Sequence, residues 1–447
     1  MKSKTVILGS ARTPFGRLGG ALASLQSTTL GGEAIRAALI AARLDPAEVD
    51  HVVMGQVLQG GAGQAPSRQA AYKAGLAKTV TFETINKICA SGMIAIVNGA
   101  RAIDDDDASV VIAGGMESMS NAPYAMLQGR FGYRFGDATL VDLMQYDGLV
   151  DPYSKLSMAE GQTRVNADLG ITREVQDEFA YHSHERAARA QVEGLLAGEM
   201  TPLRVATKAK GKLVLDAVPV NAKPRIPAYV GGNGNGASAG LFRDALAELS
   251  PAVDQYTPYV SGDVPFALVD ADEPVRPEAS LASMAKLPPL ERGGTVTAGN
   301  APGVNDGAAA LVLASEDYAA AHGCEILGHV VDHAAAAWDP AYLALTPAMA
   351  SKKLLDRHGL VPSDIDVWEV NEAFAAVAWS TARLLGIDPR AINRLGGAVA
   401  FGHPIGASGA RITASVAHQL RRRGGGRGIA AICSGGGQGD AILIEVR

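Results

Sequence analysis

The segment Asn86-Lys87-Ile88-Cys89-Ala90-Ser91-Gly92-Met93 is the stretch around which the rest of the chain can be organised. A β-like run, Val80 to Ile88, leads into the cysteine, and an apolar run with helical spacing, Met93 to Ile103, follows it. A cysteine at such a junction lies among unpaired helix N–H groups at the positive end of the helix dipole, and both lower the pKa of a thiol. Small residues leave room for a substrate, and Ser91 is expected to cap the helix. The pattern predicts a nucleophilic Cys89, with a buried structural cysteine as the alternative.

Length and composition indicate a globular chain of two or three domains. The chain has 447 residues, of which 47% are hydrophobic and 19% are charged. A net charge of −6 argues against a nucleic-acid binder or a basic membrane-surface protein. Three cysteines without a C-x-x-C pair predict neither a disulfide framework nor a zinc site. The short apolar run at the start and the lack of any run of about 18 apolar residues predict a cytoplasmic protein without a membrane contact.

Strands and helices alternate through the first part of the chain, which predicts an α/β core. The apolar runs predict strands at Thr5–Leu8, His51–Leu58 and Ser109–Ala113, the last closed by Gly114-Gly115, and helices at Thr28–Arg43 and Pro66–Lys73. The first strand is expected to be broken by the segment from Ala11 to Gly16.

The region from Met116 to about Arg292 is more polar and irregular. It contains one clear helical pattern, Glu174 to Gln191, with Thr172 in a capping position. The tract from Gly231 to Gly236 has the composition of a flexible linker. We interpret residues 118–294 as a loop domain inserted into the α/β core, with a glycine-rich insertion at about 218–265.

The alternating pattern resumes after Gly294. A helix and a strand are expected within Asp306–Ser315, and further elements are expected at Glu325–Asp332, Thr346–His358, Asp366–Val370 and Ser408–Arg421, followed by a closing pair of strands. The core is thus predicted to have an N-terminal half, residues 1–117 and 295–322, and a C-terminal half, residues 323–447.

A weak internal repeat supports this division. Ala90-Ser91-Gly92 opens a helix that leads to a strand ending in Gly114-Gly115, and Ala407-Ser408-Gly409 opens a helix that leads to a strand ending in Gly435-Gly436-Gly437. Two similar α/β units would face each other, with reactive loops where they meet.

Four loops supply the candidates for chemistry. Cys89 is the candidate nucleophile, His403 lies in a glycine-rich loop, Cys433 ends an apolar strand, and Asn371 with Glu372 lies between a strand and a helix. Each has a structural explanation when it is taken alone: a lone histidine is more often structural, a strand cysteine is usually part of a core, and Asn371 could cap its helix.

Taken together, these loops resemble thiolases. The resemblance is carried by Asn86–Ile96, Thr295–Ala309, Glu369–Ala375, Gly396–Arg411 and Cys433–Gly439, in this order, and extends to Ala11–Gly16 and Gly114–Ser118. It implies the thiolase fold: two similar α/β halves in a five-layer α-β-α-β-α arrangement with an inserted loop domain. It also implies a homodimer or a homotetramer.

The resemblance assigns roles to five residues. Cys89 would carry the acyl group as a thioester, and His403 would accept its proton and help to bind the thioester oxygen. Asn371 would hold a water molecule at this first oxyanion site. Cys433 would exchange the α-proton of the second substrate, and the N–H groups of Cys89 and Gly435 would form a second oxyanion hole. Such chemistry needs a nucleophile, a base, oxyanion donors and an acid/base at the α-carbon.

The resemblance also places CoA along the inserted domain, near Ser283 and the backbone of Ala298 and Gly299. It implies neither a metal nor a cofactor, because the CoA thioesters are substrates. The sequence departs from the family at Pro302, where a serine near pantetheine is common, and at Leu156-Ser157-Met158, where many members have His-Met-Gly.

The function implied is the reversible condensation of two acetyl-CoA to acetoacetyl-CoA and CoA through an acyl-cysteine intermediate. A thiolase of fatty-acid degradation that acts on longer 3-ketoacyl-CoA substrates is the alternative among enzymes. A thiolase-like protein that binds acyl-CoA without catalysis is the alternative in another class, although the candidate catalytic residues are all present.

Overall fold

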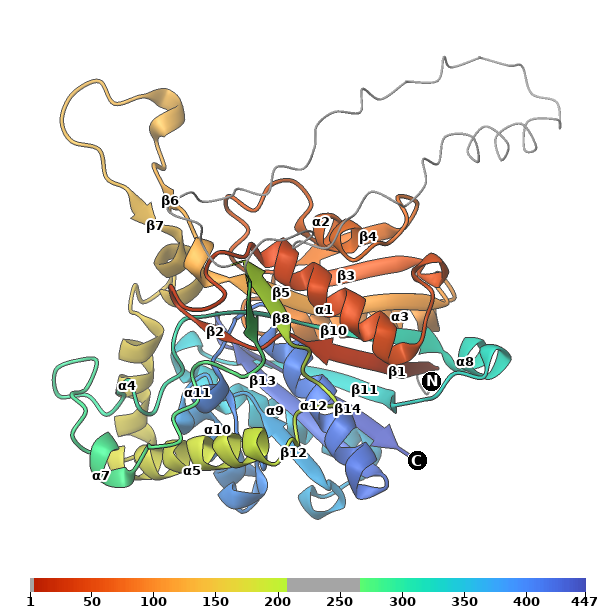
Figure 1. Ribbon diagram of the computed structural model, residues 1–447. Coiled ribbons are helices and arrows are strands. Elements are labelled where there is room, and N and C mark those ends of the chain that lie inside the picture. Colours follow the sequence, from red (N-terminus) through yellow and green to blue (C-terminus); the bar gives the residue numbers. More distant parts are fainter. Residues whose placement is uncertain (1–3, 207–265) are drawn as a thin grey trace. The chain divides into compact units, whose positions relative to one another are not determined.

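A computed structural model describes residues 4–206 and 266–447 (Figure 1). Residues 1–205 and 268–447 form one compact unit, and residues 206–267 are separate from it. The predicted glycine-rich insertion, including Gly231–Gly236, lies outside the described residues. The remaining elements belong to the first unit, which carries all the candidate site residues.

The strands of the N-terminal half form one part of a large mixed sheet, in the order β1-β10-β5-β3-β4. The pairs β1–β10 and β10–β5 are antiparallel, whereas β3 is parallel to both β4 and β5. The bounds are β1 Thr5–Arg12, β3 His51–Gly55, β4 Thr81–Ile85, β5 Val110–Ser118 and β10 Asn305–Ser315, with the short β2 Gly16–Arg17 beside β10. Every residue of β1 and β5 is buried, which explains their nearly continuous apolar sequences.

The strands of the C-terminal half follow in the order β12-β13-β14-β11. Their bounds are β11 Gly328–Ala337, β12 Val367–Val370, β13 Gly426–Ser434 and β14 Gln438–Val446. The two groups of strands meet where β1 pairs with β11 through Val6 with His329 and Ile7 with Gly328.

Helices complete a five-layer arrangement, which confirms the predicted fold class. Helices α1 (Ser27–Ala42) and α2 (Pro66–Lys73) cover the N-terminal strands, and α9 (Thr346–His358) and α10 (Ala375–Leu385) pack on the C-terminal half. Helices α3 (Ser91–Asp104) and α12 (Ser408–Arg423) contact each other; α3 packs on strands of the N-terminal half, and α12 contacts strands of both halves. They therefore form the middle layer, where one buried apolar cluster includes residues from both halves.

Glycines allow α3 and α12 to approach closely. A Cβ atom added at Gly92 would lie 2.8 Å from the carbonyl oxygen of Gly406, and one added at Gly409 would lie 2.6 Å from the nitrogen of Met93. A side chain at either position would clash with backbone. Both helices begin at a serine, Ser91 and Ser408, which supports the internal repeat.

The described parts outside these layers are mostly helices and short strands. They comprise β6 Tyr124–Ala125, β7 Val141–Asp142, α4 Met158–Leu169, α5 Arg173–Val192, β8 Leu203–Ala206, β9 Phe266–Val269, α7 Leu281–Met284, α8 Glu316–His322 and α11 Ala398–Phe401. Short 3₁₀ helices occur at Pro46–Glu48, Met119–Asn121, Gly129–Phe131, Pro340–Leu345, Pro362–Asp364 and Pro389–Ala391, and a π-helix occurs at Met144–Leu149.

Several expected boundaries are wrong. Strand β1 continues to Arg12, and β5 runs through Gly114 and Gly115 to Ser118. These glycines are packed rather than terminal, because a Cβ at Gly115 would lie 2.0 Å from the Gly406 carbonyl oxygen. The segment Asp306–Ser315 is strand throughout, because its alanines are buried at successive positions between β1 and β5.

The helix α4 was not predicted, although its start carries a recognisable signal. The Ser157 hydroxyl accepts a hydrogen bond from the Glu160 N–H, and the Glu160 side chain accepts one from the Ser157 N–H. This capping box corresponds to the sequence pattern Ser-x-x-Glu. In α5, Thr172 caps the helix as expected.

Candidate active site

A cavity of about 270 Å³ brings four of the predicted site residues together. Cys89, His403, Cys433 and Gly435 all line it. The rest of the wall is mainly apolar and includes Met119, Leu149, Met158, Leu343, Phe374 and Ile405. The cavity can therefore hold a small apolar group beside two thiols and one imidazole.

Cys89 lies in the turn between β4 and α3, as the sequence indicated. The preceding residue, Ile88, has a φ of 45°, a backbone conformation that a β-branched residue rarely adopts. Ser91 does not cap α3; its hydroxyl donates to the Ile88 carbonyl oxygen at 2.6 Å and accepts from the Lys87 N–H at 2.8 Å. Ser91 therefore holds the turn that presents the thiol.

The expected lowering of the Cys89 pKa is wrong for the free protein. Burial raises the pKa of the Cys89 thiol to about 12, although the N–H groups of Cys89 and Gly435 donate towards the sulfur and oppose this rise. Burial also raises the pKa of Cys433 well above its usual range, and the neighbouring Cys89 adds to this effect. The cavity favours two neutral thiols, because removal from water outweighs the backbone N–H groups that donate to the sulfur atoms.

His403 is held by three hydrogen bonds in the loop between α11 and α12. Its N–H donates to Asn305 Oδ1 at 2.8 Å, its Nδ1 lies 2.6 Å from Ser408 Oγ, and its Nε2 lies 3.4 Å from Asn371 Nδ2. Ser408 Oγ donates its own hydrogen to the Pro404 carbonyl oxygen. Ser408 must therefore accept from Nδ1–H, which leaves Nε2 without a proton.

The electrostatic environment also keeps the His403 ring neutral. Burial, with a smaller contribution from the positive charge of Arg411, lowers the pKa of His403 to about 3. A neutral imidazole whose Nε2 carries no proton, and accepts only a long hydrogen bond of 3.4 Å from Asn371 Nδ2, is able to accept a proton from a thiol.

Asn371 and Cys433 come from neighbouring parallel strands. Cys433 lies near the end of β13, and Asn371 directly follows β12, so parallel pairing brings both to one edge of the sheet. Asn371 is fully buried, and its Oδ1 atom has no hydrogen-bond partner among the described residues. A buried amide oxygen without a partner is a suitable acceptor for a water molecule.

Glu117 holds two backbone segments next to the site, and the sequence did not predict this role. Its carboxylate accepts backbone N–H groups from Val57 at 3.0 Å, Leu58 at 3.1 Å and Gly406 at 3.0 Å. Burial raises the pKa of Glu117 to about 7. The residue joins the end of β5 to the loop that carries His403. Glu117, Asn305 and Ser408 lie within motifs quoted above, but the sequence assigned them no role. The contacts of Glu117 and Asn305 come from distant segments, and that of Ser408 depends on the conformation of the loop that carries His403.

The predicted CoA-contacting residues do not line the cavity. Ser283 is exposed in α7, where its hydroxyl donates to the Ser280 carbonyl oxygen at 2.8 Å. Ala298 is exposed, and the Gly299 N–H donates to Thr297 Oγ1 at 3.1 Å. Pro302, in the same segment, does line the cavity.

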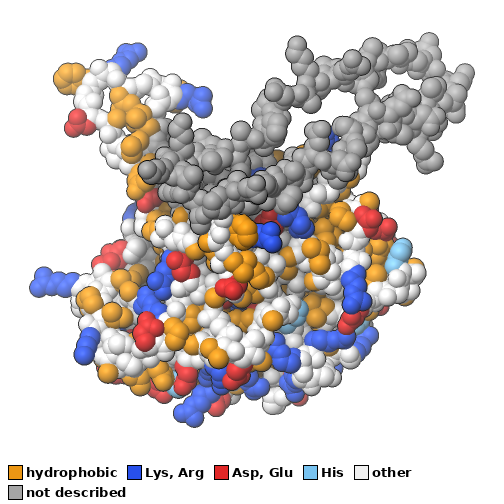
Figure 2. All heavy atoms as spheres, viewed as in Figure 1, with side chains coloured by type: hydrophobic (Ala, Val, Ile, Leu, Met, Phe, Trp, Pro, Cys, Tyr) orange, Lys and Arg blue, Asp and Glu red, His pale blue; other side chains and the backbone are white. Residues whose placement is uncertain are grey.

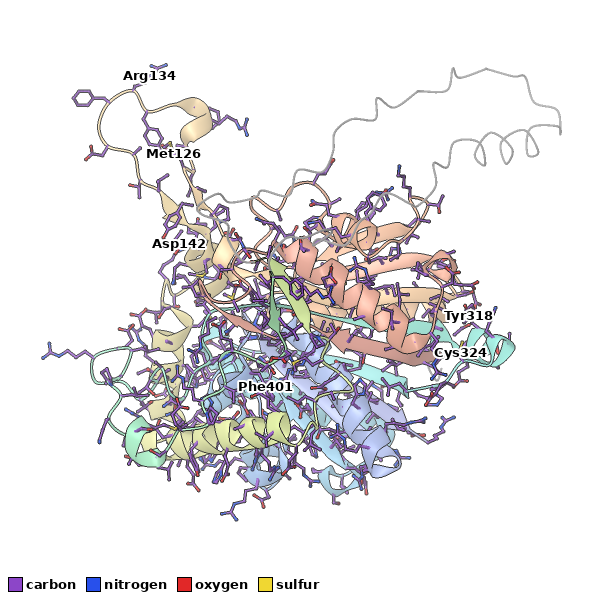
Figure 3. All side chains as sticks on the ribbon, in the orientation of Figure 1. Met126, Arg134, Asp142, Tyr318, Cys324 and Phe401 are labelled. Carbon is purple, nitrogen blue, oxygen red and sulfur yellow. The ribbon has the colours of Figure 1, made fainter. Side chains whose placement is uncertain are left out.

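The third cysteine, Cys324, lies just after α8 and is not part of the cavity wall (Figure 3). Across residues 4–206 and 266–447, no cluster of three or more His, Cys, Asp or Glu side chains is arranged to hold a metal ion. No helix in these same ranges has the length and apolarity required to cross a membrane.

Comparison with known proteins agrees with the fold. The family described as "Thiolase, N-terminal domain" matches residues 5–227 and 257–317, and "Thiolase, C-terminal domain" matches residues 324–446. The chain belongs to the thiolase family. It is 40% identical over 441 residues to "Acetyl-CoA acetyltransferase" of Cupriavidus necator, covering 98% of each chain. It is 38% identical over 441 residues to the protein of the same name from Escherichia coli, again covering 98% of each chain. A "Probable acetyl-CoA acetyltransferase" of Mycobacterium tuberculosis is 39% identical over 443 residues, or 99% of each chain.

Proposed function

We propose that the protein is an acetyl-CoA C-acetyltransferase that interconverts two acetyl-CoA with acetoacetyl-CoA and CoA. The observation that carries this proposal is the convergence of Cys89, His403, Cys433 and Gly435 on one small apolar cavity. The names of the relatives that match almost the whole chain support the choice of acyl donor.

In the first half-reaction, His403 Nε2 takes the proton of Cys89 as the sulfur attacks the acetyl carbonyl carbon. This coupling is needed because burial keeps the Cys89 thiol protonated in the free protein. The carbonyl oxygen becomes negative, and His403, now protonated at Nε2, and a water held by Asn371 stabilise it. The tetrahedral intermediate collapses, the leaving CoA sulfur takes the proton from His403 Nε2, and Cys89 retains the acetyl group as a thioester.

In the second half-reaction, a second acetyl-CoA enters and His403 Nε2, neutral again, takes the thiol proton of Cys433. The resulting Cys433 thiolate removes a proton from the methyl carbon of this acetyl-CoA, and His403 later returns its proton to the Cys89 sulfur. The resulting enolate carbon attacks the acetyl-Cys89 carbonyl carbon. The N–H groups of Cys89 and Gly435, which both point towards the Cys89 sulfur, are placed to stabilise that thioester oxygen. The carbon–sulfur bond then breaks, which releases acetoacetyl-CoA and restores Cys89. Neither half-reaction requires a metal or an organic cofactor.

We assign CoA binding to Ser283 in the loop domain, residues 118–294, and to Ala298 and Gly299 in the segment that directly follows this domain. Leu290, Ala301 and Pro302 support this assignment, because they bring the same segment to the cavity wall. The pantetheine arm would run from there to Cys89. Pro302 has no backbone N–H to offer and no hydroxyl, so this position would contribute only packing.

The assembly we propose is a homodimer or a homotetramer in the cytoplasm. An arm between β6 and β7 extends from the described unit and exposes Phe131 and Phe135 to solvent (Figures 1 and 2). Exposed aromatic side chains of this kind are typical of contact surfaces. Three cysteines with free thiols are consistent with a reducing compartment.

The experiment that tests the proposed function is a series of thiolysis rates with 3-ketoacyl-CoA substrates of increasing chain length and free CoA. We expect the highest kcat/KM with acetoacetyl-CoA and a steep fall with longer chains, because the cavity is small. Equal or higher rates with long chains would identify a thiolase of fatty-acid degradation. Tight CoA binding without turnover of any substrate would identify a binding protein.

A further inference from the structure

The turn that presents Cys89 is held by an ion pair from the opposite half of the molecule. Lys87 lies two residues before the nucleophile, and its Nζ atom lies 2.9 Å from Oδ1 and 2.8 Å from Oδ2 of Asp440. Asp440 is on β14, and its side chain is fully buried. We propose that Asp440 is a positioning residue that acts through Lys87 to set the geometry of Cys89. This inference rests on the proposed function, which gives Cys89 its role.

The turn needs such support because its backbone is strained. A β-branched residue at φ 45° has a conformation that persists only where the surroundings enforce it. Restraints from the turn itself come from Asn86 Oδ1, which accepts the Ile88 N–H at 3.0 Å, and from the Ser91 hydroxyl. These contacts hold the shape of the turn, but they do not fix it relative to the C-terminal half.

Two contacts from the C-terminal half fix the position of the turn relative to that half. The Ser434 hydroxyl donates to the Lys87 carbonyl oxygen at 2.6 Å, and the Asp440 carboxylate holds the Lys87 ammonium group. Ser434 lies between Cys433 and Gly435, and Asp440 follows on the next strand. The β13–β14 hairpin, which supplies Cys433 and the Gly435 N–H, therefore also holds Lys87 through Ser434 and Asp440.

The Asp440 carboxyl group is contacted from two sides. His333 Nε2, from β11, lies 2.9 Å from Asp440 Oδ1, and Lys87 lies on the other side. Lys87 and His333 are both mostly buried side chains, whereas Asp440 is shielded completely from solvent. None of Lys87, His333 and Asp440 lines the cavity, but Lys87 belongs to the turn that carries Cys89, and Asp440 pairs on β14 with Ile432, the residue before Cys433.

The test uses Asp440→Asn and Lys87→Met, singly and together, in the full-length protein. The three variants should lose about 10- to 100-fold in kcat with KM for CoA changed less than about 3-fold, because small displacements of reacting groups are costly whereas the CoA site is untouched. The double variant should be no worse than Asp440→Asn alone, because both changes break one contact. Acetylation of Cys89 and condensation should slow equally, since both steps use the Cys89 sulfur.

Asp332→Asn is the matched control. Asp332 lies on β11 and has a similar network, accepting from Arg357 at 2.8 and 2.7 Å and lying 2.9 Å from His358 Nε2. It also accepts the backbone N–H of His333 at 2.7 Å, but it contacts neither Lys87 nor Asp440 nor the Cys89 turn. The control should lower the melting temperature without changing kcat measured well below that temperature. If Asp332→Asn lowered kcat as much as Asp440→Asn did, or if Asp440→Asn kept wild-type kcat, the positioning role would be disproved.

A second measurement separates this proposal from the proposed function. Alkylation of Cys89 by iodoacetamide, followed by intact mass, reports the exposure and setting of the thiol without any CoA substrate. Asp440→Asn and Lys87→Met should change its rate by at least about 5-fold relative to both wild type and Asp332→Asn. An inactive wild-type protein would refute the proposed function, while an unchanged alkylation rate would refute the positioning role. If Asp440→Asn failed to fold, Lys87→Met, a change at a partly exposed residue, would test the same contact.

Discussion

Ser408 Oγ lies 2.6 Å from His403 Nδ1 and donates its own hydrogen to the Pro404 carbonyl oxygen. The serine can therefore only accept from the imidazole, and this fixes the proton on Nδ1. The other ring nitrogen, Nε2, therefore carries no proton, and it lies 3.4 Å from Asn371 Nδ2. A hydroxyl that carries out no chemistry thus selects the tautomer that can serve as a base.

We expect Ser408→Ala to lower kcat about 10-fold, equivalent to roughly 1.4 kcal/mol, because Nδ1 would lose its acceptor and the other tautomer would become populated. The measurement is the rate of acetyl transfer at saturating substrate. Ser415→Ala is the control, because Ser415 is buried on the same helix and contacts Gln419 rather than His403. Equal losses in the two variants would show that the effect comes from the helix.

The protonation state of the free protein gives a second prediction. Burial raises the pKa of Cys89 to about 12 and lowers that of His403 to about 3, so both side chains are neutral near pH 7. A difference titration of wild type against Cys89→Ser should show no thiolate absorbance step between about pH 5 and about pH 9. A step in this range that disappears in Cys89→Ser would instead show a stable thiolate–imidazolium pair.

Cys433→Ala should separate the two half-reactions. Acetylation of Cys89 by acetyl-CoA should remain, whereas condensation should fall by ~10²–10⁴-fold, the usual contribution of a general acid or base. Intact mass measures the acetyl group, and absorbance measures acetoacetyl-CoA. Cys89→Ala is the comparison that should lose both. Condensation at the wild-type rate in Cys433→Ala would remove Cys433 from the mechanism, and loss of acetylation in a folded variant would move it to the first step.

The arm gives a prediction about assembly. Phe131 is 87% exposed in its 3₁₀ helix, and Phe135 is fully exposed. Replacing both by serine should reduce the mass in light scattering without lowering the melting temperature of the subunit, because neither side chain packs in the core. Val192→Ser, at an 89% exposed position at the end of α5, should leave the mass unchanged. An unchanged mass in the arm variant would mean that subunits associate elsewhere.

The sequence was informative where local pattern and chemistry coincide. Helices α2 and α9 match their predicted bounds because proline begins the first and a glycine follows the second. The nucleophile turn and the histidine loop could be recognised because cysteine and histidine are rare beside small residues. These features depend on neighbours in the chain, which the sequence records directly.

Other features depend on distant contacts and could not be predicted. The Cys89 pKa rises because residues from several loops bury the thiol. The sequence around Cys89 shows only the helix that follows it, and that helix alone predicts a lower pKa. The role of Glu117 requires three N–H groups from two remote segments. Strand β10 was partly taken for a helix because alanine favours helices intrinsically, and burial between two strands overrides that preference.

The close packing of α3 against α12 has a practical consequence. A chain divided before Gly323 would leave Cys89 on one fragment and Asn371, His403 and Cys433 on the other. Neither fragment could turn over substrate alone, and each would expose the apolar face that the other covers. Acetyl transfer on mixing would then report reassociation of the fragments, and a bulky residue at Gly92 or Gly409 would abolish the signal by keeping them apart. The activity of the two mixed fragments would therefore depend on how closely α3 packs against α12.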